Sequence, residues 1–304
     1  MRSLLCLFSM MFICSFCATA QKDGQEYPFG SRGRNSDQPG IFIWHSETAG
    51  LFARKSGNLS LVGASRYGLT TTMELSTHLA LDYWIPNLSV KKSWRQDQWV
   101  ISSRHTLSSA TPGLQWARRH AHFDLVTDEP VPFLISATNE LLVSRPFIDK
   151  TGCNGSHPWL VLTAGASISF GVPFESYDGR EMEAHFLANR GEAWAGRGAY
   201  GTLKARADWM VNRGLFLRGG LRYFVGSFTG HHAMEMDAAV EYFLKSRLSF
   251  SGGAMVSMAG YRELNFFGFL PFVDITWYFG SHNVLQSGLF ERDVVKSISR
   301  KKRR

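Results

Sequence analysis

Residues 234–245 of the chain read Met-Glu-Met-Asp-Ala-Ala-Val-Glu-Tyr-Phe-Leu-Lys. Apolar or small side chains occupy every even position, and the odd positions carry Glu235, Asp237 and Glu241. Because successive side chains of a β-strand point to opposite faces, this stretch predicts a strand with one oily face and one charged face. Strands of soluble proteins usually have ~5–6 residues. The longer run found here suits a strand that crosses a bilayer at a tilt.

The same alternation recurs along the chain, in Thr72–Tyr83, Trp159–Gly171, Thr202–Trp209 and Leu215–Val225. It predicts twelve strands, near residues 59–67, 71–83, 87–94, 98–107, 132–144, 158–171, 180–190, 198–210, 214–226, 233–246, 247–258 and 269–279. Fourteen strands result if 47–56 or 112–127 pairs as well. Single-chain bacterial barrels have an even number of strands.

The predicted fold class is therefore all-β, a transmembrane antiparallel up-and-down β-barrel. A soluble sandwich also alternates with period two. Strand length and the charged inner faces favour the membrane barrel over the sandwich.

Charges of both signs follow one another on the polar faces of successive segments, and we expect them to pair across a lumen. This predicted network consists of Glu74, His78, Asp82, Glu140, Lys204, Arg206, Asp208, Arg218, Arg222, Glu235, Asp237 and Glu241. Glu74, His78 and Asp82 are spaced by four residues in one segment, so a strand there would turn all three inward. Such a network can line a pore or neutralise the interior of a plugged barrel.

Six tryptophans lie near the ends of the predicted strands: Trp84, Trp94, Trp99, Trp159, Trp209 and Trp277. An indole ring can contact hydrocarbon and headgroups together. We interpret the six as membrane-interface aromatics.

The N-terminus has the pattern of an export signal, because Arg2 precedes an apolar run from Leu4 to Phe16 and a small-residue site at Ala18–Ala20. We expect cleavage before Gln21 and an outer-membrane location. The predicted organisation is a signal peptide over 1–20, a periplasmic extension over 21–45 that plugs or lines one mouth, a barrel over 46–280 and a basic periplasmic tail over 281–304.

The formal charge of +8 is concentrated at the C-terminus. The basic residues there are Lys296, Arg300, Lys301, Lys302, Arg303 and Arg304. Export argues against a nucleic-acid partner. A solvated tail without a partner is the preferred interpretation, and an anionic envelope polymer is the partner that such a tail would fit.

One stretch carries residues suited to nucleophilic catalysis: Ser103 and His105, with Ser108 nearby. It lacks the His-x-Ser-Asn-Gly pattern of outer-membrane phospholipases, so a non-enzymatic barrel is the preferred interpretation. His231 and His232 would point to opposite faces of a strand and cannot easily share a metal. We therefore expect no metal and no cofactor.

The stretch from Leu270 to Phe279 is alternating and aromatic, and it resembles the closing strand that the barrel assembly machinery reads in outer-membrane proteins. Here 25 residues follow Phe279, so the signal would be internal. Three short stretches, 66–70, 73–75 and 86–91, resemble the opening hairpins of uncharacterised outer-membrane barrels of Bacteroidota-like bacteria. Both resemblances imply the assembly machinery and outer-membrane lipid as partners.

The function predicted from the sequence is passage of small solutes or envelope organisation. Two alternatives stay open: a lipid hydrolase of the outer membrane, and a surface-interaction protein that acts through extracellular loops.

Overall fold

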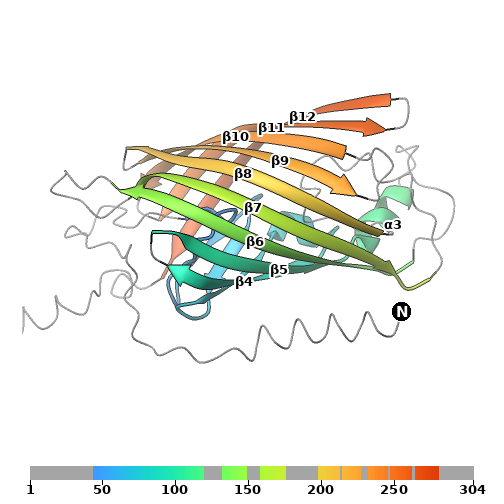
Figure 1. Ribbon diagram of the computed structural model, residues 1–304, viewed down its shortest axis with the longest axis horizontal. Helices are drawn as coiled ribbons and strands as arrows, with labels where there is room; N and C mark the ends of the chain where they lie inside the picture. Colours follow the sequence, from blue (N-terminus) through green and yellow to red (C-terminus); the bar gives the residue numbers. More distant parts are fainter. Residues whose placement is uncertain are drawn as a thin grey trace, which may run out of the picture.

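The chain forms a closed barrel of twelve antiparallel strands in which each strand pairs with its neighbours in sequence and β1 pairs with β12 (Figure 1). The computed structural model describes residues 44–96, 98–119, 132–148, 158–175, 198–212, 214–226, 232–245, 247–261 and 264–280. The predicted all-β, up-and-down barrel is confirmed. Of the two described helices, neither is long and apolar enough to span a membrane.

The strands differ greatly in length. They are β1 (Gly57–Ser60), β2 (Ser65–Gly68), β3 (Met73–Thr77), β4 (Asn87–Gln96), β5 (Val100–Ser108), β6 (Leu134–Ile148), β7 (Pro158–Pro173), β8 (Gly198–Asn212), β9 (Leu215–Gly226), β10 (His232–Lys245), β11 (Leu248–Tyr261) and β12 (Leu264–Phe279). Two helices interrupt them, α2 (Leu79–Asp82) and α3 (Thr111–Arg119). The long strands β6 to β12 lie side by side in the barrel wall (Figure 1).

The two faces of the barrel wall have opposite chemistry. In β10, Glu235 and Glu241 are buried in the lumen, while Met236, Val240 and Tyr242 are exposed on the outside. A soluble barrel would place its oily residues inside. The exposed outer face of this barrel is oily and its interior is charged, as in barrels that stand in lipid.

The two ends of the barrel also differ. At one end, called here the short-turn end, the connections are 69–72, 97–99, 149–157, 213–214 and 246–247, and β12 finishes there. At the other, the long-loop end, two connections span 109–133 and 174–197. Outer-membrane barrels have short periplasmic turns and longer extracellular loops.

The prediction of one strand over 59–67 was wrong, because β1 and β2 are separate strands joined by a turn at 61–64. Asp274 of β12 holds this turn. Its carboxylate accepts hydrogen bonds from Ser60 Oγ (2.5 Å) and from the backbone N–H groups of Val62 (2.9 Å) and Gly63 (3.3 Å). A buried carboxylate that gathers donors in this way bends the chain although the side-chain pattern continues.

The strand predicted over 71–83 was also wrong beyond Thr77, where β3 ends and α2 follows. Asp82 accepts hydrogen bonds from Thr77 Oγ1 (2.7 Å) and from the backbone N–H of Asn87 (3.1 Å), which closes a compact turn. Glu74 therefore lies in the barrel wall, whereas His78 and Asp82 belong to a turn at the long-loop end.

The count of twelve was right, but its membership was not. β7 pairs directly with β8, so no strand stands between them, and the predicted strand at 180–190 falls outside the described residues. Neither candidate range for a fourteen-stranded barrel contains a further strand among its described residues. Residues 47–56 have no strand before Gly57, and the described part of 112–127 belongs to α3.

The strand ladders are shortest around β1, where the barrel closes. β1 meets β12 through four residue pairs and meets β2 through two, whereas β11 and β12 share fourteen. The seam between the first and last strands is thus much shorter than the ladder on the other side of β12.

Candidate functional site

Residues 44–56 precede β1, form no strand and are called here the lumen segment. Contacts of residues 44–52 with inward-facing side chains of β2 to β6 and β8 place that part inside the barrel, whereas Arg54 and Lys55 are exposed. Thr48 and Ala49 are completely buried, and the backbone N–H of Ala49 donates to Ser144 Oγ of β6 at 2.8 Å. The sequence predicted a periplasmic extension over 21–45 that plugs or lines one mouth, and a barrel from residue 46. The structure places the barrel start at Gly57, and residues 21–43 are outside the described part.

Glu47 is the main charged anchor of the lumen segment. Its carboxylate contacts Lys204 Nζ at 2.8 Å, Arg104 Nη1 at 3.0 Å and Arg222 Nη2 at 3.5 Å. Glu140 of β6 contacts the first two cations as well, at 2.5 Å from Lys204 and 2.7 Å from Arg104. Two carboxylates and three cations therefore join the segment to β5, β6, β8 and β9.

Backbone carbonyls of the lumen segment are held by two further cations of the wall. Lys91 Nζ donates to the carbonyls of Ser46 (2.7 Å) and Thr48 (3.0 Å), and Arg66 donates to that of Trp44. Glu74 accepts from Arg66 Nη2 at 2.7 Å and lies 3.6 Å from Lys91. Because these contacts use main-chain atoms, they fix the path of the segment whatever its side chains.

Further ion pairs on β8, β9 and β10 extend this network, which Arg222 links to Glu47. Arg206 pairs with Asp208 (3.1 Å) and Asp237 (3.3 Å). Arg218 pairs with Asp208 (3.7 Å) and with Glu241, and Arg222 lies 3.7 Å from Glu235. The structure thus brings ten of the twelve predicted network residues into the lumen wall, all except His78 and Asp82.

Apolar side chains gather in the lumen at the short-turn end. Val161, Phe216 and Phe243 form one buried cluster, and Ala49, Val100 and Leu142 form another. Trp44 packs against both clusters. Trp44 of the lumen segment therefore joins the two clusters into one apolar layer, called here the floor.

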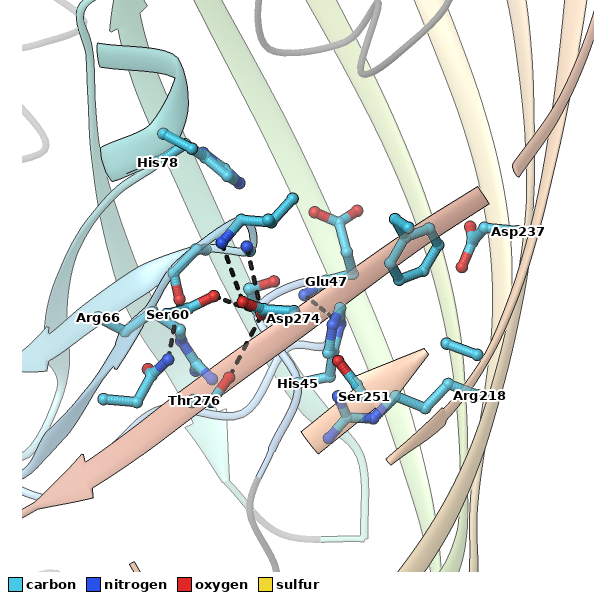
Figure 2. Close-up of a pocket in the computed structure, with 18 of the residues that line it drawn as sticks. His45, Glu47, Ser60, Arg66, His78, Arg218, Asp237, Ser251, Asp274 and Thr276 are labelled. Carbon is cyan, nitrogen blue, oxygen red and sulfur yellow. Dashed lines mark hydrogen bonds between the residues drawn. The ribbon is translucent and has the colours of Figure 1, made fainter. Parts of the chain in front are cut away.

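A cavity of about 350 Å³ lies above this floor. Its lining includes His45 and Glu47 of the lumen segment, Arg218 and Asp237 of the wall, and His78 before α2 (Figure 2). Apolar side chains share the lining, among them Val62, Leu81, Met255, Leu270 and Phe272. A cavity of this size and mixed polarity can hold a small polar solute or several waters.

Burial and charge act on the two titratable groups of the lumen segment. Burial lowers the pKa of His45 well below its usual 6.5, and Arg206 and Arg218 lower it further. Burial alone would raise the pKa of Glu47, but Arg104, Lys204 and Arg222 hold it well below its usual 4.5. At neutral pH, His45 is therefore neutral and Glu47 is ionised.

Five of the six predicted interface tryptophans lie near the short-turn end: Trp94, Trp99, Trp159, Trp209 and Trp277. Each is between 43% and 48% exposed. Trp84 lies instead at the long-loop end, after α2, where its ring meets Trp116 of α3 at 6.1 Å.

The predicted nucleophile candidates separate onto two faces. Ser108 is buried in the lumen. Ser103 and His105 lie on the outer face of β5, with His105 Nε2 3.2 Å from Ser103 Oγ. His105 Nδ1 lies 2.7 Å from Oδ1 of Asn139 on β6, a residue that the sequence interpretation missed. A polar residue at an outward position of an otherwise oily strand was the signal that could have found it.

No family model and no curated protein matches this sequence. Solved structures similar to the barrel include a KdgM porin in complex with disordered oligogalacturonate, at 10% identity and a TM-score of 0.36, covering 74% of this chain and 96% of that one. OccAB4 of Acinetobacter baumannii has 12% identity, a TM-score of 0.35 and coverage of 74% and 53%. OccK8 (OprE) of Pseudomonas aeruginosa has 12% identity, a TM-score of 0.36 and coverage of 82% and 61%. The chain thus spans less than two thirds of the last two, and these likenesses concern barrel architecture only.

Proposed function

We propose that the protein is an outer-membrane barrel for small polar solutes whose passage is closed at rest by residues 44–56. The observation that carries this proposal is the lumen segment itself. Hydrogen bonds and ion pairs hold it against the inner wall, and it forms no strand ladder with the described strands. Contacts of this kind can be broken and remade, so the segment suits a gate.

Outer-membrane insertion is part of the proposal. The oily exterior, the charged interior and the tryptophans near the short-turn end support it. We also propose that the short-turn end faces the periplasm, and its short connections support this placement. The resemblance of the opening hairpins supports the proposal that the protein is of the Bacteroidota-like type. Migration of the unboiled and boiled protein on a gel tests the insertion, since folded membrane barrels shift on boiling; a chain that is monomeric and soluble without detergent would contradict it.

A disulfide that locks the lumen segment tests the gate. Ala49 and Ser144 are adjacent, because the backbone N–H of one donates to the hydroxyl of the other at 2.8 Å. In a chain with Cys153 replaced by serine, A49C/S144C should stay closed in a planar bilayer when oxidised and regain the wild-type opening frequency when reduced. Equal conductance of small ions in both states would show that the segment does not gate the lumen.

Envelope organisation is a second candidate function. β12 ends at the short-turn end, and the basic residues Lys296 to Arg304 follow it in the sequence. Binding of the purified barrel to anionic cell-wall polymer, compared with a chain that stops at Gly280, tests this candidate.

A further inference from the structure

Three polar side chains on the outer face of β5 and β6 form a continuous chain of hydrogen bonds. Ser103 Oγ contacts His105 Nε2 at 3.2 Å, and His105 Nδ1 contacts Asn139 Oδ1 at 2.7 Å. His105 and Asn139 are direct partners in the antiparallel ladder between the two strands. The arrangement is therefore fixed by backbone register and not by a flexible loop.

The position of this cluster is unusual for the outside of the barrel. The next outward residues of β5 are Ile101 and Leu107. On the other side of β6, the ladder partner of Asn139 is Ile168 of β7. Polar groups that face hydrocarbon carry a desolvation cost, which apolar residues at the same positions would avoid. Their mutual hydrogen bonds reduce that cost but do not explain why three polar residues gather here.

The hydrogen-bond directions leave the serine ready to act as a nucleophile. Oδ1 of Asn139 can only accept, so the proton of His105 lies on Nδ1 and Nε2 is left as an acceptor. Trp94 Nε1–H donates to Ser103 Oγ at 2.9 Å. The serine hydroxyl then directs its own proton to His105 Nε2. Nucleophile, base and orienting group stand in the order of a Ser-His-Asn triad.

β4 supplies two further groups beside Ser103. The ladder between β4 and β5 shifts register between Ser93 and Arg95, so Trp94 sits at a bulge, a device that re-aims a side chain. Lys92 is the direct ladder partner of Ser103, and its ammonium lies 4.3 Å from the centre of the Trp94 ring. The strand beside Ser103 thus supplies a hydrogen-bond donor and a positive charge, and a positive charge is a group that stabilises an oxyanion or a phosphate.

The depth of the cluster fits an ester bond of a lipid. Ser103 is the third residue after Val100, with which β5 begins at the short-turn end. At a rise of about 3.3 Å per residue and a tilt of about 45°, it lies roughly 7 Å into the wall. Interface tryptophans mark the headgroup level, and the glycerol esters of a phospholipid lie just below it.

We propose that Ser103, His105 and Asn139 form an acyl-ester hydrolase site that faces the membrane and takes glycerophospholipids. This inference goes beyond solute passage and rests only on the membrane insertion proposed above. Ser103 Oγ attacks the ester carbonyl carbon while its proton passes to His105 Nε2. The ester C–O bond breaks, and His105 gives that proton to the departing lysolipid alkoxide.

Water completes the cycle. His105 Nε2 takes a proton from a water molecule, whose oxygen attacks the acyl carbonyl. The bond to Ser103 Oγ breaks, the serine regains a proton from His105, and a fatty acid leaves. During both steps, the Lys92 ammonium supplies positive charge for the carbonyl oxygen, while the Trp94 N–H orients Ser103. Asn139 acts as a positioning residue that holds the tautomer and orientation of His105.

The test measures release of labelled fatty acid from phosphatidylglycerol vesicles by the full-length barrel. We expect S103A to lower turnover by about 10³-fold or more. The matched control is S102A, because Ser102 is the adjacent residue on the lumen face and its hydroxyl makes no hydrogen bond among the described residues. Its turnover should equal that of the wild type. A fluorophosphonate should label the wild type at Ser103 and leave S103A unlabelled.

The role of Asn139 has its own readout. N139A should lose turnover, and N139D should restore it with the acid limb of the pH–rate profile moved to higher pH, because a carboxylate raises the pKa of the imidazole beside it. A merely structural asparagine would not move that limb. Folded, heat-modifiable wild type without turnover, or S103A as fast as wild type, would overturn the hydrolase and leave the gate standing. A chain soluble without detergent would instead overturn membrane insertion.

Discussion

Replacement of Glu47 by alanine should open the lumen. In the seated segment, this carboxylate contacts Arg104, Lys204 and Arg222 within 3.5 Å, and its side chain is 9% exposed. Loss of one partner from a buried ion pair generally costs about 3–5 kcal/mol. Arg104 and Lys204 still pair with Glu140 in this variant, so we expect a cost at the lower limit of that range, about 3 kcal/mol. This energy corresponds to a shift of roughly two orders of magnitude toward the unseated segment.

Single-channel recording in planar bilayers measures that shift as the fraction of time spent open. S46A is the matched control, since Lys91 binds the carbonyl of Ser46 and not its side chain. We expect E47A to open far more often than both the wild type and S46A. If the three proteins gate alike, Glu47 does not hold the segment and the reasoning from the lumen ion pairs is wrong.

Three further outcomes are expected. Acid should open the lumen, because both titratable groups of the lumen segment stop stabilising its seated state when they are protonated. His45 stabilises that state fully above pH 6.5 and progressively less below it, and Glu47 loses its contribution below pH 4.5. H45Q should abolish the first phase, due to His45, when conductance is measured against pH. D274A should lower the free energy of unfolding in urea by about 3 kcal/mol, since Ser60 and the turn after it lose their acceptor. An unchanged free energy of unfolding would show that this turn carries no stability. H105L should abolish lipid hydrolysis while the free energy of unfolding stays equal or rises, and a clear fall would mark a structural cluster.

Most of the barrel could be predicted from the sequence because lipid on one side and water on the other impose strict alternation. Met234–Lys245 and Thr202–Trp209 satisfy that rule through their whole length and form long strands. The prediction from alternation failed where side chains form hydrogen bonds with the backbone. Asp274 and Asp82 bend the chain within stretches that still alternate, so the predicted strands at 59–67 and 71–83 did not form as drawn.

The candidate sites were less predictable, because each depends on contacts between distant parts of the chain. Residues 47–56 show no pattern that distinguishes a lumen segment from an irregular strand. Ser103 and His105 were visible as a pair, but Asn139 joins them only through the register of β5 against β6. The 109–133 connection between those strands is too long for the sequence to fix that register.

The four-pair seam between β1 and β12 bears on how the molecule is made. The hairpins from β6 to β12 bring long ladders together early, since each joins neighbours in sequence. Closure requires the first strand, β1, to pair with the last strand, β12. This pairing gains few hydrogen bonds, because it extends only from Gly57 to Ser60 in β1. We expect ring closure to be the last step of assembly, and thermal opening of the finished cylinder to start at the same place.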